Sequence, residues 1–131
     1  MLEIRRLVAV LLLSTAACQP SAPPVIGGID LAKPAQALGT EPFWGVEIRP
    51  DLLILTGVDR EELRVANPGA RMEGGAAVFA AEGLTLTLKA AACSDGMSDR
   101  TYPLEAEARV GEEVLKGCAD SQASLDAGPR P

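Results

Sequence analysis

The strongest constraint on the fold is a strict alternation of apolar and polar side chains in the second half of the chain. Leu84, Leu86 and Leu88 are separated by threonines, and residues two positions apart share one face of a β-strand. Residues 104–110 and 44–48 alternate in the same way. An amphipathic helix would instead repeat its apolar residues every three to four positions. The pattern therefore predicts strands with one face in the core and the other in solvent.

Turn residues separate these alternating segments about every ten positions. Examples are Asn67-Pro68-Gly69 and Gly74-Gly75, both typical of tight turns. The sequence thus predicts seven strands in meander order, over residues 43–49, 52–57, 62–66, 76–81, 84–91, 101–110 and 112–118. The expected fold is all-β, a small antiparallel meander curled into an open sheet or barrel and stapled by a disulfide. The alternative is a helix over residues 60–66 against a shorter sheet.

The first 17 residues have the features of a secretory signal peptide. Arg5 and Arg6 precede an apolar run over residues 7–13, and small residues occupy positions 14–17. The run is shorter than the roughly 20 apolar residues of a membrane-spanning helix. Cys18 follows directly, and a small-residue box that ends in cysteine resembles the lipobox of bacterial lipoproteins. The alternative is an ordinary cleaved signal followed by an incidental cysteine.

This resemblance implies that Cys18 is lipidated and becomes the new N-terminus, so that the protein is anchored in the bacterial cell envelope and faces the periplasm. Gln19 follows the cysteine, and similarity to lipoprotein sorting signals points to the outer membrane. Residues 18–39 are rich in proline and glycine, which predicts a flexible tether behind the lipid. The β domain is expected over residues 40–119, and residues 120–131 are expected to form a disordered tail.

Composition excludes several classes of function. The chain contains no histidine, which rules out histidine-dependent catalysis and histidine-ligated metals. It has four aromatic residues and a net charge of −6, and both facts argue against binding to nucleic acid. The sequence therefore predicts no metal, no cofactor and no enzymatic activity. The alternative is an enzyme that uses carboxylate chemistry from Glu41, Asp95 or Asp99.

Cys93 and Cys118 remain once Cys18 is assigned to the lipid, and an exported protein meets an oxidising compartment. A hairpin that turns at Gly111 would bring Cys118 to the end of the sheet where the strand before Cys93 finishes. The sequence therefore predicts a Cys93–Cys118 disulfide. The alternative, a redox or metal pair, lacks CxxC spacing and further ligands.

The densest polar cluster lies between Cys93 and Pro103. One interpretation is a binding loop that is pinned by the disulfide and carries the polar residues Asp95, Asp99, Arg100 and Tyr102. The other interpretation is a connecting loop, since Asp95 and Gly96 suit a tight turn and nearby serines can bond to the backbone.

A second candidate is the segment that contains Phe43 and Trp44, whose rings face opposite sides of a strand. One ring is expected in the core, while the other can serve as an exposed anchor for a partner. The alternative is that both rings only pack. If strand 43–49 pairs with strand 112–118 in a closing meander, Trp44 lies near Cys118, and the two segments form one surface.

These segments also carry a resemblance. The strings GTEPFW, CSDGMSDRTYP and Gly117-Cys118-Ala119 are similar to those of a family of small bacterial envelope lipoproteins of unassigned function, some associated with lysozyme-inhibitor-type domains. The resemblance spans about residues 38–119. It implies an exported β-rich domain and brings no catalytic residue.

The sequence therefore predicts a lipid-anchored periplasmic binding domain whose partner is an envelope protein, with lysozyme-inhibitor-like activity as one concrete form. The alternative is a carrier of a small ligand or envelope lipid in an apolar barrel interior, where small residues such as Ala77, Ala106 and Ala108 would leave room.

Overall fold

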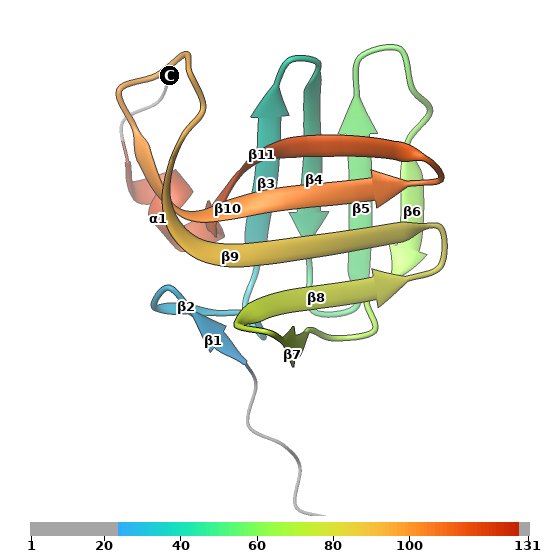
Figure 1. Cartoon of the computed structure of the whole chain (residues 1–131), viewed down its shortest axis with the longest axis horizontal. Helices are drawn as coiled ribbons and strands as arrows, with labels where there is room; N and C mark the ends of the chain where they lie inside the picture. Colours follow the sequence, from blue (N-terminus) through green and yellow to red (C-terminus); the bar gives the residue numbers. More distant parts are fainter. Residues whose placement is uncertain (1–23, 129–131) are drawn as a thin grey trace, which may run out of the picture.

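The strands of this protein form one nine-stranded antiparallel sheet and a separate two-stranded hairpin. The computed structural model describes residues 24–128 (Figure 1). The hairpin consists of β1 (Val25–Ile26) and β2 (Ile29–Asp30). The large sheet contains β3 (Ala35–Thr40), β4 (Phe43–Ile48), β5 (Leu52–Gly57), β6 (Leu63–Ala66), β7 (Arg71–Glu73), β8 (Ala76–Ala81), β9 (Leu84–Ser94), β10 (Thr101–Val110) and β11 (Glu113–Ser121). A short helix, α1 (Gln122–Ala127), follows.

The sheet curls into a half-barrel with strand order β6-β5-β4-β3-β11-β10-β9-β8-β7. In Figure 1, β8, β9 and β10 cross in front of β3, β4, β5 and β6, so the two halves of the sheet face each other. Strand β11 joins the halves, because residues 113–119 pair with β10 and residues 118–121 pair with β3. The apolar faces of both halves therefore meet in one core.

Side chains fill the inside of the half-barrel. Leu53, Leu86 and Phe79 are fully buried in one hydrophobic cluster. Ala77 and Ala108, where the sequence left room for a ligand, are also fully inaccessible to solvent. A residue that borders a cavity large enough for a water molecule would show accessible surface. These two alanines therefore line no such space.

The all-β prediction is confirmed, as is the curled antiparallel sheet with its disulfide. Every predicted strand is present to within a few residues. The alternative of a helix over residues 60–66 is wrong, because Leu63–Ala66 pairs with β5 as strand β6.

Two predicted boundaries need correction. The expected tether over residues 18–39 contains β1, β2 and most of β3. The expected disordered tail over residues 120–131 contains the end of β11 and helix α1. Asp120 and Ser121 still pair with β3, and the Ser121 hydroxyl accepts a hydrogen bond from the Ser124 backbone N–H, which begins the helix.

The expected pairing of strand 43–49 with strand 112–118 is wrong. Strand β3 lies between β4 and β11 and pairs with both. The inward residues of β3 are Ala35, Ala37 and Gly39, which are too small to give a clear hydrophobic pattern.

The predicted signal peptide over residues 1–17 and the lipidation site Cys18 lie outside the described residues. Within residues 24–128, no helix has the length and apolar character needed to cross a membrane.

Candidate binding surface

The segment 93–102, which we call the arm, folds over the outer face of β11 and β3. On β11, Leu115 and Ala119 point into the core, so Cys118 and Asp120 point outward. Both outward residues are nevertheless buried. They are buried because the arm covers them.

Three links fix the arm on this face. The first is the predicted Cys93–Cys118 disulfide, with Cα atoms 5.6 Å apart. In the second, the Thr40 hydroxyl donates a hydrogen bond of 2.9 Å to the Asp95 backbone carbonyl. In the third, the Arg100 guanidinium lies 4.0 Å from the Asp120 carboxylate. The arm is therefore attached near both of its ends, and Met97 in its middle stays exposed.

The Asp95 carboxylate organises the arm from within. It accepts hydrogen bonds from the backbone N–H groups of Met97 and Ser98, from the Ser98 hydroxyl and from the Tyr102 hydroxyl. These bonds, led by that from the Ser98 backbone, lower the pKa of Asp95 to about 2. A carboxylate has about four acceptor sites, so Asp95 has none left for a ligand.

Tyr102 and Arg100 stabilise the base of the arm. The Tyr102 ring is buried, and this burial, together with the bond to Asp95, raises the pKa of the phenol. The Arg100 guanidinium lies 5.8 Å from the centre of that ring, within cation–π range. It also packs against Gly128 at the end of α1, where any side chain would overlap it.

Trp44 and Phe43 point to opposite sides of β4, as the sequence predicted. Trp44 is on the inner face and 4 % exposed, and its indole N–H donates to the Lys116 carbonyl over 3.2 Å. The indole covers Gly39, where a Cβ atom would overlap the ring. Phe43 is on the outer face and 51 % exposed. Phe43 is thus the exposed ring, and Trp44 belongs to the core.

The arm and the segment around Phe43 lie on the two sides of a groove of about 360 Å³. Its lining comes from the β3–β4 turn, the arm and β11, and comprises Thr40, Glu41, Ser94, Asp95, Gly96, Met97, Lys116 and Gly117. The structure therefore brings together the two segments that the sequence singled out.

Of the predicted binding residues, only Asp95 lines this groove. Asp95, Arg100 and Tyr102 are held in contacts within the protein, whereas Phe43 and Asp99 are exposed. Sequence reasoning missed Thr40, Lys116 and Met97, the last of which is 70 % exposed at the tip of the arm. An apolar residue inside a polar loop was the one signal that could have identified Met97.

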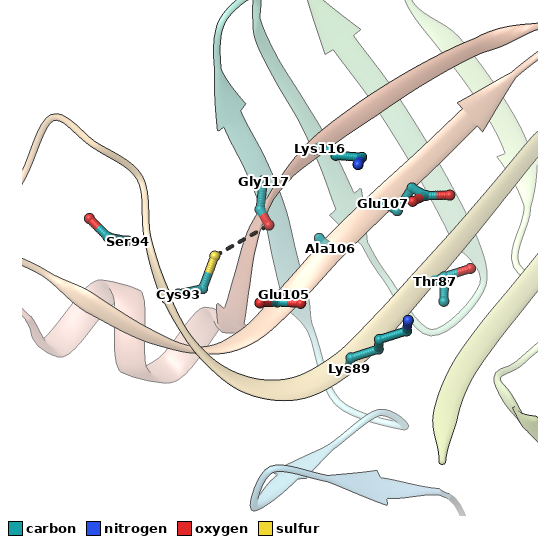
Figure 2. Close-up of a pocket in the computed structure, with 9 residues that line it drawn as sticks. All are labelled: Thr87, Lys89, Cys93, Ser94, Glu105, Ala106, Glu107, Lys116 and Gly117. Carbon is teal, nitrogen blue, oxygen red and sulfur yellow. Dashed lines mark hydrogen bonds between the residues drawn. The ribbon is translucent and has the colours of Figure 1, made fainter. Parts of the chain in front are cut away.

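A second groove, of about 600 Å³, lies on the other side of the arm (Figure 2). It covers the outer face of β9, β10 and β11 and is lined by Thr87, Lys89, Cys93, Ser94, Glu105, Ala106, Glu107, Lys116 and Gly117. The Cys93 sulfur lies 3.4 Å from the Gly117 carbonyl oxygen. Because a disulfide sulfur has no proton to donate, this approach is a packing contact.

Across residues 24–128, no group of three or more acidic or cysteine side chains is arranged to hold a metal ion. Comparisons of the chain with protein-family models, with curated proteins and with solved structures find no match.

Proposed function

We propose that this protein is a lipid-anchored domain of the bacterial cell envelope and that it acts by binding another protein. The observation that carries the proposal is the arm itself. It is fixed by a disulfide, by Thr40 and by Arg100, yet it leaves Met97 exposed in a groove whose other side is the Thr40–Glu41 turn, two residues before the exposed Phe43. A loop that is ordered before binding loses little entropy when a partner docks.

Met97 and Phe43 are the expected apolar anchors of this surface. Large apolar side chains on a rigid support are typical of the residues that contribute most to protein–protein affinity. Glu41, Asp99 and Lys116 give the surrounding polar rim. The surface is small, which suits insertion of one side chain or loop of the partner.

The filled interior favours protein binding over the alternative of a lipid or small-ligand carrier. A carrier needs an apolar cavity for its cargo. The inner residues Leu53, Phe79 and Leu86 instead pack together without accessible surface.

Lysozyme inhibition is the most concrete form of the proposal. The chain has a net charge of −6, and an acidic surface speeds association with basic lysozymes. The acidic charge also makes electrostatic attachment to anionic lipids unfavourable. The acyl chains expected on Cys18 would therefore supply the membrane anchor.

The test uses the full chain with Cys18→Ser, so that the protein is soluble. Partners are captured from envelope extract, and inhibition of a c-type lysozyme is measured in parallel by the clearing of cell-wall suspensions. Met97→Ser and Phe43→Ser are each expected to weaken the captured interaction by about tenfold or more. Met72→Ser is the matched control, since Met72 is half exposed on β7, away from the arm.

A partner whose affinity is unchanged by Met97→Ser and Phe43→Ser would contradict the proposed surface. Wild-type protein that remains in the soluble periplasmic fraction, with no acyl mass on Cys18, would contradict the anchor.

A further inference from the structure

The larger groove holds most of the lysines of this protein. The chain has three lysines, Lys33, Lys89 and Lys116, and the last two line the groove on the outer face of β9, β10 and β11. Figure 2 shows both over these strands, together with Glu105 and Glu107. Two of the three lysines of an acidic protein thus gather at one place.

The lysines differ from the arginines in how they are paired. The six arginines in residues 24–128 each have a carboxylate within 4.0 Å, with partners Glu47, Glu113, Glu62, Glu73, Asp120 and Glu107. In the same part of the chain, no such ion pair involves Lys89 or Lys116. Their ammonium groups are therefore available to an anionic group from outside.

The strand register arranges the charges of the groove in a fixed pattern. Glu105 lies opposite Lys89 on one side of β10, and Glu107 lies opposite Lys116 on the other side. Glu107 is held by Arg109 at 3.0 Å, whereas Glu105 forms no ion pair in the described residues. The groove thus presents one lysine on each side of β10, with Glu105 level with Lys89 and two residues along the strand from the level of Lys116.

The backbone positions of the two lysines are separated by two strand spacings across the sheet and by two residues along it, about 12 Å in all. A ligand with two carboxylates at a similar separation can contact both lysines, and an ammonium group between the carboxylates can contact Glu105. The volume of about 600 Å³ exceeds what one amino acid needs and lies in the usual range for small-molecule sites. The lining is polar, since Thr87, Ser94 and the Gly117 carbonyl add neutral hydrogen-bonding groups.

We infer that this groove binds a short peptide that carries both carboxylate and ammonium groups, with its carboxylates on Lys89 and Lys116 and an ammonium on Glu105. This groove shares Ser94, Lys116 and Gly117 with the groove beside Met97, whereas Thr87, Lys89 and Glu105 belong to it alone. The disulfide at Cys93 fixes the wall that separates the two grooves.

The experiment titrates the full chain carrying Cys18→Ser with the tetrapeptide Ala-Glu-Lys-Ala, which has free termini, and follows amide chemical shifts. The expected shifts are confined to residues 87–89, 105–107 and 116–117. Lys89→Gln, Lys116→Gln and Glu105→Gln are each expected to weaken binding about tenfold, the usual size for loss of a charged hydrogen bond. Raising the salt concentration is expected to weaken binding as well.

Two matched controls keep the charge change and move it elsewhere. Lys33→Gln removes the third lysine, and Glu82→Gln removes a carboxylate in the turn between β8 and β9; neither is expected to alter peptide binding. An acetylated and amidated peptide with glutamine and norleucine in place of glutamate and lysine is expected not to bind.

The inference is overturned if the groove residues do not shift at about 10 mM peptide, a concentration that would detect even weak affinity. It is also overturned if the uncharged peptide binds equally well, or if Lys33→Gln weakens binding as much as Lys116→Gln. Met97→Ser and Phe43→Ser are expected to leave peptide binding unchanged, so this result and the proposed partner surface can fail separately.

Discussion

Thr40 and Asp95 are 55 positions apart in the sequence, and the hydroxyl of Thr40 donates a 2.9 Å hydrogen bond to the backbone carbonyl of Asp95. This bond joins the two segments that carry the proposed binding surface. It also makes the position of the arm depend on β3, a strand with little hydrophobic signal of its own.

Replacing Thr40 with valine keeps the shape of the side chain and removes the donor. Thr40→Val is expected to lower the free energy of unfolding by about 1 kcal/mol, the usual net contribution of one hydrogen bond. Amide exchange in residues 94–100 is expected to accelerate more than exchange in β9 and β10. Thr40→Ser retains the donor and serves as the control, and equal exchange in the two variants would show that the bond does not hold the arm.

Asp95 predicts a specific dependence of stability on pH. The pKa of Asp95 is about 2 in the folded protein because backbone and side-chain groups of the arm donate to the carboxylate, while an unfolded aspartate has a pKa near 3.9. Because the folded pKa is lower, the contribution of Asp95 is fully present above about pH 4 and is lost as the pH falls toward 2. Asp95→Asn should therefore be less stable than wild type at pH 6, and the difference should shrink near pH 2.5. Urea unfolding at both pH values measures this, and a constant difference would mean that the charge of Asp95 has no role.

The disulfide is expected to contribute strongly to stability. Cys93 and Cys118 are 25 positions apart, and closing a loop of that size contributes roughly 3.5 kcal/mol in the chain-entropy model. The double variant Cys93→Ala/Cys118→Ala should melt at least about 10 °C lower than wild type. Thermal unfolding with and without reductant checks this. A reductant-insensitive melting temperature in wild type would contradict the prediction, and the double variant supplies the control for effects of the reductant itself.

Arg100 and Asp99 are adjacent but are expected to behave differently. Arg100 is 14 % exposed in its side chain and lies beside the buried Asp120 carboxylate, the Tyr102 ring and the end of α1. Arg100→Ala leaves the Asp120 carboxylate without its cation and is expected to cost about 2 kcal/mol. Asp99 is exposed, so Asp99→Ala should change stability by less than about 0.5 kcal/mol. Chemical denaturation of both variants tests the contrast, and equal stabilities would show that the Arg100 contacts contribute nothing.

The strands with strict alternation were predictable because their apolar residues are large. Leu84, Leu86 and Leu88 all point from β9 into the hydrophobic core, as their spacing indicated. The inward face of β3 is made of alanine and glycine, and at Gly39 the Trp44 indole occupies the space that a side chain would need. A pattern of large side chains cannot reveal a strand whose role is to leave space for another residue.

For the candidate site, the sequence correctly indicated the disulfide and the two segments. It assigned Asp95, Arg100 and Tyr102 to partner binding, whereas their side chains form contacts within the protein. The tight turn at Asp95 follows from local chemistry, whereas the bond from Tyr102 to its carboxylate depends on how the arm folds back. That path includes a break in the β9–β10 register between Tyr102 and Leu104, at Pro103. Proline lacks the N–H of a regular ladder, but proline alone does not give the direction of the bend.

The early start of the sheet limits how far the domain can extend from a lipid anchor at Cys18. If Cys18 carries the lipid, only five residues lie between it and Pro24, the first described residue, and a chain of that length spans at most about 20 Å. The β1–β2 hairpin packs against the base of the arm, where Gly27 lies beside Pro103 and Ala90, and the tip of the arm points away from the hairpin in Figure 1. A domain on so short a tether stays in a thin layer next to its membrane, with the tip of the arm directed outward. Partners embedded in or attached to that same membrane would then meet the arm more often than targets deep in the cell-wall space.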